Sequence, residues 1–163
     1  MRTRAMEAIE IAKKAGIPVS LDAADPFVIG AVHDVMKSLI AEHVDVLFLN
    51  ASEAEALCGC PAEEAATQLG KEIDTVVVKL GSQGSIAVHH GEQYRAGIHK
   101  VEAQDTTGAG DAYASGFLYG LLKGWSPDRA ADLGSRVASL AVAQLGAVVR
   151  SRDVLSQAIA QSR

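Results

Sequence analysis

The sequence predicts an α/β fold with three layers, in which helices cover both faces of a mostly parallel sheet. Helical patterns alternate along the chain with short apolar, β-branched runs, as is typical of strands buried between helices. An antiparallel hairpin is expected at the sheet edge, because the runs 84–90 and 93–96 are separated only by a turn at Gly91-Glu92. No internal repeat or low-complexity linker interrupts the pattern, so we expect one domain over residues 1–163.

Proline and capping patterns mark the ends of the helices. Asp25-Pro26 is expected to break the chain before a helix. Ser52 and Glu55 have the spacing of a capping box and open another helix, and Pro61 begins the next. The remaining helices are expected over residues 3–15, 32–42, 108–123, 127–145 and 153–161.

Three short apolar runs, 17–21, 44–49 and 75–80, are the expected strands before the hairpin. The longest uncharged apolar stretch, 137–149, is shorter than the roughly 20 residues that span a bilayer. It is interpreted as a buried helix, and no membrane segment is expected.

Composition is typical of a cytoplasmic protein. The chain is 48% hydrophobic and 21% charged, with a formal net charge of −5. A nucleic-acid partner is disfavoured, because no basic stripe is present to neutralise phosphates. Cys58 and Cys60 flank one glycine, too close for an ordinary disulfide and without a second pair for zinc, so they are expected to be reduced thiols.

The most informative segment is Asp105–Gly116, with the sequence DTTGAGDAYASG. Glycines at 108 and 110 let backbone N–H groups approach an anion, and the following helix start adds unsatisfied donors and a positive dipole end. Asp111 is then placed to take a proton from a hydroxyl that attacks a bound phosphoryl group. An aspartate also favours a helix N-terminus for dipole reasons alone, so this pattern by itself leaves a structural role open.

The whole run resembles the C-terminal signature of the ribokinase, or PfkB-type, carbohydrate kinase family, which includes adenosine kinases. The resemblance implies a ribokinase-like three-layer α/β/α sandwich and transfer of the ATP γ-phosphoryl to a sugar or nucleoside hydroxyl. It implies Asp111 as the catalytic base and the amides of Gly108, Ala109 and Gly110 as the anion hole. Family members are about twice as long as this chain, so 1–163 is expected to match their C-terminal, nucleotide-binding half.

Asn50 and Glu53 follow a predicted strand and stand three apart, so one helical turn can present both at the strand ends where ligands of open sheets bind. Helix capping explains the pair equally well on its own. Their spacing resembles the family's Asn-x-x-Glu motif, which implies that they orient phosphate oxygens and hydrated Mg²⁺, with Glu53 acting through water.

The segment 79–84, KLGSQG, resembles the family's nucleotide-binding turn, with Gly81 and Gly84 close to ATP. An ordinary hairpin turn is the alternative for these glycines. Many members carry threonine or another small polar residue at the Lys79 position. A lysine there either contacts phosphate as a point charge or points into solvent.

The resemblance extends to the helix that follows the Asp111 motif. Ser135 falls where members place a small or polar residue near adenine, although most of this helix reads simply as core. The resemblance also implies a site for a monovalent cation such as K⁺ at Asp105, Thr107, Ala141, Gln144 and Gly146.

The acceptor is left open between adenosine, ribose, fructose and other sugars, with adenosine-kinase-like members looking most similar. A second interpretation is a nucleotide-binding half that does no catalysis alone and associates as a homodimer or with a complementing N-terminal half. A third is a structural module that keeps the motif but forms no ligand site.

Overall fold

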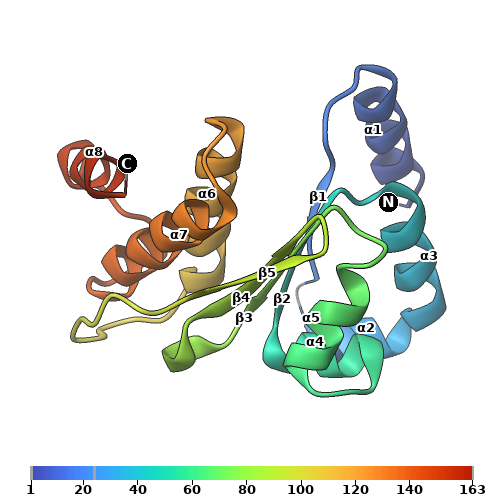
Figure 1. Ribbon diagram of the computed structural model, residues 1–163, viewed down its shortest axis with the longest axis horizontal. Helices are drawn as coiled ribbons and strands as arrows, with labels where there is room; N and C mark the ends of the chain where they lie inside the picture. The colour runs from blue at the N-terminus through green and yellow to red at the C-terminus, as the bar shows by residue number, and fades with distance from the viewer. Residues whose placement is uncertain (1, 24, 163) are drawn as a thin grey trace. The chain divides into compact units, whose positions relative to one another are not determined.

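The computed structural model describes residues 2–23 and 25–162 (Figure 1). In chain order its elements are α1 (Arg2–Lys14), β1 (Ser20–Asp22), α2 (Pro26–Ala31), α3 (His33–His43), β2 (Val46–Asn50), α4 (Ala51–Cys58), α5 (Ala62–Leu69), β3 (Thr75–Lys79), the 3-10 turn η1 (Gly81–Gln83), β4 (Ser85–His89), β5 (Glu92–Ala96), α6 (Ala109–Leu122), α7 (Pro127–Val142) and α8 (Arg152–Gln161).

The five strands form one sheet in the order β1-β2-β3-β4-β5. β1 and β2 are parallel, with Ser20 opposite Val46 and Asp22 opposite Phe48. β4 and β5 form the hairpin at the edge. The predicted α/β fold, with a mostly parallel sheet and an antiparallel edge hairpin, is therefore confirmed.

Contacts divide the chain into two compact units. Unit 1 comprises Met1–Val78 and Val88–Gln93, and unit 2 comprises Lys79–Ala87 and Tyr94–Arg163. The buried core of unit 1 includes Leu47, Phe48, Leu49, Leu57 and Val76, and that of unit 2 includes Ile86, Tyr113, Phe117, Leu133 and Val137. The expectation of a single domain stays a prediction.

The helix expected over 32–42 is α3, and a further short helix, α2, precedes it at Pro26–Ala31. Asp25 caps α2, since its side chain accepts a hydrogen bond from the backbone N–H of Phe27 at 2.7 Å, and Pro26 takes the first helical position. Proline suits that position because its missing N–H would be unsatisfied there anyway. Asp25-Pro26 thus begins a helix, and the expected chain break at this pair is wrong.

The expected buried helix over 137–149 is also wrong in its second half. α7 ends at Val142, and the side chains of Leu145 and Val148 are 73% and 71% exposed. The chain turns at Gly146, which has a φ of +91° and donates its N–H to the Asp105 carboxylate at 3.0 Å.

Two other boundaries shift. The hairpin turns at His90-Gly91 rather than Gly91-Glu92, because both residues have positive φ, 48° and 82°, as a type I′ turn requires. β1 begins at Ser20 rather than Ile17, because the Ile17 N–H still bonds the carbonyl of Ala12 in α1, at 2.9 Å.

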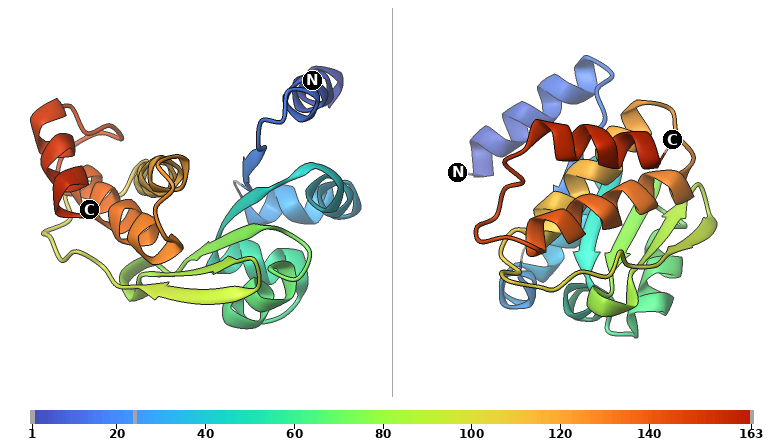
Figure 2. Two further views of the ribbon diagram at one scale, coloured as in Figure 1. Left: turned by 45° about the horizontal axis from the view of Figure 1, so that its top comes forward. Right: turned by 90° about the vertical axis from the view of Figure 1, so that its left-hand side faces the viewer.

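α6 and α7 lie side by side in unit 2 (Figure 2). Their contact is close because glycines lie at the crossing: a Cβ at Gly116 would lie 2.9 Å from the carbonyl oxygen of Leu133, and one at Gly134 would lie 2.9 Å from that of Tyr113. This packing holds the start of α6 in place. Among the described residues, no helix is long and apolar enough to cross a membrane.

Candidate active site

The start of α6 is open to a ligand. Gly108 is the N-cap residue, with a φ of +74°, and no described side chain caps this end of the helix. A Cβ at Gly108 would lie 2.6 Å from the Cβ of Ala147 and 2.9 Å from its carbonyl oxygen, so only glycine fits. The Ala109 N–H already donates to the Thr106 carbonyl at 3.2 Å, which makes it the least available of the three expected anion-hole amides.

Asp111 lies in the first turn of α6, and its side chain is exposed at this open end. The helix is anchored two residues further on, where the hydroxyls of Tyr113 and Ser85 share a buried hydrogen bond of 2.7 Å. Burial raises the pKa of Tyr113 to about 12, so the phenol stays protonated at neutral pH. No sequence pattern marks this pair, because the two residues are 28 positions apart.

Lys79, the last residue of β3, brings its ammonium group to the same place. A Cβ at Gly110 would lie 3.1 Å from the Lys79 Nζ. The Lys79 ammonium group therefore lies at the start of α6, and the choice between a phosphate contact and a solvent-facing lysine stays a prediction. Gly110 permits the close approach because it has no side chain.

The turn between β3 and β4 depends on Gly84. The Leu80 N–H donates to the Gly84 carbonyl at 2.8 Å, and Gly84 has a φ of +86°. A Cβ there would lie 2.0 Å from the carbonyl oxygen of Ala96 in β5. Gly81 also has a positive φ, +58°, but no described heavy atom lies within 4 Å of a Cβ built on it.

A cavity of about 630 Å³ lies beside this turn within unit 2. Residues from three predicted segments line it, together with a loop that the sequence does not single out: Gly81, Ser82, Gly84, Ile98, His99, Lys100, Val101, Ala103, Thr106, Ala109, Ser135, Ala138, Ser139 and Val142. Ser135 therefore lies at the cavity, as does the first residue of α6. The Ser135 hydroxyl donates to the Gly97 carbonyl at 2.7 Å, so toward a ligand it can only accept.

Some of the positions expected to hold the monovalent cation are linked by hydrogen bonds through Asp105. One Asp105 oxygen accepts from the Thr107 N–H at 2.9 Å and the other from the Gly146 N–H at 3.0 Å. Hydrogen bonds from Thr107, and then from Gly146, hold the pKa of Asp105 below its ordinary value. Ala141 remains in α7, where its carbonyl accepts from the Gln144 N–H at 3.4 Å. Hydrogen bonds thus connect three of the five expected cation positions, Asp105, Thr107 and Gly146. The other two, Ala141 and Gln144, adjoin Gly146 in sequence.

Asn50 and Glu53 belong to unit 1, where they form the capping box of α4. The box expected at Ser52 and Glu55 is therefore wrong. Asn50 Oδ1 accepts from the Glu53 N–H at 2.9 Å, and Glu53 Oε2 accepts from the Asn50 N–H at 2.7 Å. Ser52 instead donates to Asn50 Oδ1 at 2.7 Å.

Magnesium fits this pair as a water-mediated contact. Glu53 is only 3% exposed, and Asn50 bonds both of its carboxylate oxygens, Oε1 at 2.5 Å and Oε2 at 2.7 Å. Each carboxylate oxygen keeps a further acceptor site, which suits a water of a hydrated Mg²⁺ ion. In the described part of the chain, no three His, Cys, Asp or Glu side chains gather into a direct metal site.

We expect Gly108→Ala to destabilise the chain by roughly 2–4 kcal/mol, from left-handed backbone strain and overpacking against Ala147. Gly124→Ala is the matched control, because Gly124 has a similar φ of +71° but no described heavy atom within 4 Å of a built Cβ. It should lose only about 1 kcal/mol. Urea unfolding measures both, and equal losses would contradict the close contact with Ala147.

The family model for pfkB family carbohydrate kinases matches residues 3–153. A curated relative, 5-dehydro-2-deoxygluconokinase of Shouchella clausii (strain KSM-K16), is 36% identical over 151 residues, which cover 88% of this chain and 46% of the relative. The ribokinase of Arabidopsis thaliana is 31% identical over 150 residues, which cover 86% of this chain and 38% of the relative. The chain spans about half or less of the length of these relatives.

Solved structures of kinases also resemble this chain. A probable sugar kinase from Rhizobium etli CFN 42 superposes with a TM-score of 0.89 at 30% identity, over 96% of this chain and 48% of that one. The adenosine kinase of Sinorhizobium meliloti superposes with a TM-score of 0.87 at 32% identity, with the same coverage of both chains. The ribokinase-like fold expected from the Asp105–Gly116 run is thereby confirmed.

Proposed function

Because the chain belongs to the pfkB family of carbohydrate kinases, we propose that it carries the ATP-binding and phosphoryl-transfer part of a kinase that phosphorylates a sugar or nucleoside hydroxyl. The observation that carries the proposal is the open start of α6, with Asp111 in its first turn and the Lys79 ammonium beside Gly110. The adjoining cavity of about 630 Å³ has room for the base and ribose of a nucleotide.

In the proposed reaction, Asp111 accepts the proton of the acceptor hydroxyl as its oxygen attacks the γ-phosphorus. The bond from that phosphorus to the bridging oxygen of ADP breaks in line. The N–H groups at Gly108 and Gly110 and the charge of Lys79 stabilise the phosphoryl oxygens, and the Ala109 N–H joins them if it leaves Thr106. Glu53 and Asn50 would hold a hydrated Mg²⁺ ion through water, and that ion would supply neutralisation of phosphate charge.

The acceptor is proposed only as a class. The relatives named above are kinases whose names refer to a deoxygluconate, ribose and adenosine, at similar identities, so they do not single out one alcohol. A monovalent cation such as K⁺ is proposed at the Asp105 loop, and a fructokinase from Vibrio cholerae O395 with 26% identity was solved with potassium ion bound.

A second candidate is a nucleotide-binding half that lacks turnover on its own. It is favoured by the length comparison, since the chain spans only about half of the matched relatives. Pairing with a second copy or with a complementing N-terminal half would then supply the acceptor site.

The two candidates are separated by measuring ATP consumption with adenosine, ribose and fructose, alongside calorimetric titration of ATP in the presence of Mg²⁺. Turnover with one acceptor supports the kinase. Binding without turnover supports the half-site, and absence of both contradicts each proposal.

Lys79→Met is expected to weaken ATP binding about tenfold, because a charge-assisted contact to phosphate is lost. Adenosine binding should stay unchanged, since adenosine has no phosphate. The matched control is Lys71→Met, which removes an exposed lysine from unit 1. Calorimetry measures the affinities of both variants and of the parent chain for ATP and for adenosine. An equal loss of ATP and adenosine affinity in Lys79→Met would contradict a phosphate contact.

A further inference from the structure

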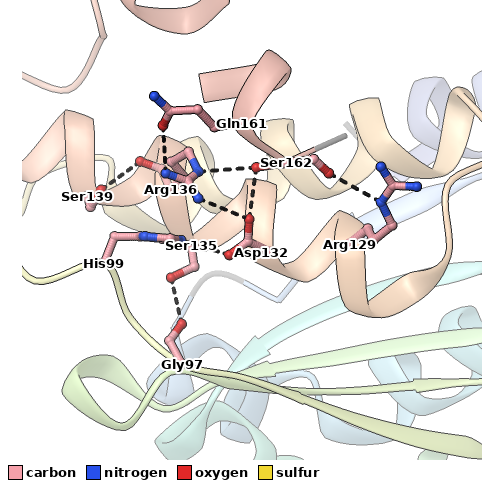
Figure 3. A network of polar contacts seen from close by, with 9 residues as sticks. All are labelled: Gly97, His99, Arg129, Asp132, Ser135, Arg136, Ser139, Gln161 and Ser162. Carbon is pink, nitrogen blue, oxygen red and sulfur yellow. Dashed lines mark hydrogen bonds and ion pairs between the residues drawn. The ribbon is translucent and has the colours of Figure 1, made fainter. Parts of the chain in front are cut away.

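Asp132 on α7 is the centre of a polar network in unit 2 (Figure 3). Its Oδ1 lies 2.8 Å from His99 Nε2, and its Oδ2 accepts from the Ser162 hydroxyl at 2.8 Å and from Arg136 Nη2 at 3.4 Å. Burial by itself raises the pKa of Asp132, but the hydrogen bonds from Ser162 and His99 outweigh it and hold the pKa below its ordinary value. The carboxylate is therefore charged at neutral pH.

On one side, this network holds a wall of the cavity. His99 belongs to the segment 98–101 that lines it, and the Gly97 carbonyl just before accepts from the Ser135 hydroxyl at 2.7 Å. Asp132 and Ser135 are three residues apart on α7, so they share one face of that helix. Two hydrogen bonds from this face thus fix the cavity wall to α7.

On the other side, the network holds the C-terminal end of α8. Ser162, which ends that helix, is only 6% exposed. Arg136 donates from Nε to the Ser162 hydroxyl at 3.2 Å and from Nη1 to the Gln161 side chain at 2.9 Å. Ala158 of α8 is buried against Leu133 and Val137 of α7 in the same cluster.

We infer that Asp132 is a positioning residue that couples α8 to the nucleotide cavity: the same carboxylate that anchors the end of α8 also holds the wall segment at His99. Loosening the Asp132 bond on one side loosens the bond on the other, because one carboxylate makes both; Arg129 and Arg136 also bond the end of α8. The ligand of the cavity rests on the proposed function, whereas the coupling between α8 and the wall does not.

Two full-chain variants test the coupling. Asp132→Asn removes the charge at the centre. Ser162→Ala removes only the hydroxyl that bonds Asp132 and Arg136, leaves the bond from Arg129 Nε to the Ser162 carbonyl at 3.3 Å, and touches no cavity-lining residue. The matched control is Asp153→Asn, which makes the same chemical change to an exposed aspartate in the first turn of α8. Hydrogen exchange of the backbone amides at 98–101 reports the wall, and the fluorescence of Trp125, packed against the cluster that contains Ala158, reports α8.

Ser162→Ala is expected to speed amide exchange at 98–101 about threefold or more, and Asp132→Asn about tenfold or more, because hydrogen bonds to a charged group are lost. Asp153→Asn should leave the exchange rates unchanged. The affinity for adenosine should fall by similar factors, while the affinity for inorganic tripolyphosphate, which needs only the start of α6, should not change. If Ser162→Ala shifts Trp125 fluorescence but leaves exchange at 98–101 as in the parent chain, the coupling is overturned. If the exchange pattern holds while the parent chain binds neither adenosine nor ATP, the coupling stands and the proposed nucleotide function fails.

Discussion

Replacing Asp111 with alanine is expected to lower turnover by at least about a hundredfold, the usual contribution of a general base. ATP affinity should stay nearly unchanged, because the side chain is exposed in the first turn of α6 and its proposed role begins only when the acceptor hydroxyl loses its proton. Turnover with the acceptor that supports the highest rate, measured beside calorimetric ATP binding, gives both quantities.

Two variants control this result. Asp111→Asn keeps the size of the side chain but cannot take a proton, so its loss of turnover should match that of alanine. Asp128→Asn makes the same change to an exposed aspartate in the first turn of α7 and should leave turnover intact. Loss of ATP binding with unchanged residual turnover in Asp111→Ala would contradict the proton-transfer role.

Replacing Gly84 with alanine is expected to be the most destabilising single methyl addition in the site. The backbone there has a φ of +86° and a ψ of −131°, a region that side chains disfavour, and the new Cβ would lie 2.0 Å from the Ala96 carbonyl oxygen. Strain and overpacking together should cost roughly 3–5 kcal/mol. Urea unfolding followed by circular dichroism measures the loss.

Gly81→Ala is the control on the same turn. Its φ of +58° carries backbone strain, but the new methyl group would meet no described atom within 4 Å, so the cost should be only about 1 kcal/mol. ATP affinity should fall in Gly84→Ala, because relief of the clash must move either the turn, which lines the cavity, or the end of β5, which leads into the cavity wall at 98–101. Equal stability of the two variants would contradict the close approach of Gly84 to Ala96.

Local patterns predicted the start of α6 well. Gly108, Gly110 and Asp111 are neighbours in sequence, so a glycine-rich turn running into a helix is sufficient to place them together. The capping box was harder, because two overlapping patterns, beginning at Asn50 and at Ser52, fit the same stretch. The choice depends on where β2 ends, and Asn50 is its last residue.

Long-range contacts explain the error at 137–149 and the omission of the Asp132 network. The turn at Gly146 depends on a carboxylate 41 residues earlier, so an apolar run around it reads as a continuing helix. The Asp132 network is equally invisible in sequence, since His99 and Ser162 lie 33 and 30 residues from it. Neither contact leaves a periodic pattern.

Titrating the ¹⁵N-labelled chain with ATP, with adenosine as comparison, tests most directly whether the start of α6 binds phosphate. ATP should shift the amide resonances of Gly108, Gly110 and Asp111 together with those of the cavity wall at 98–101, whereas adenosine should shift the wall alone. ATP binding that leaves the amides of Gly108, Gly110 and Asp111 unshifted would contradict the phosphate site.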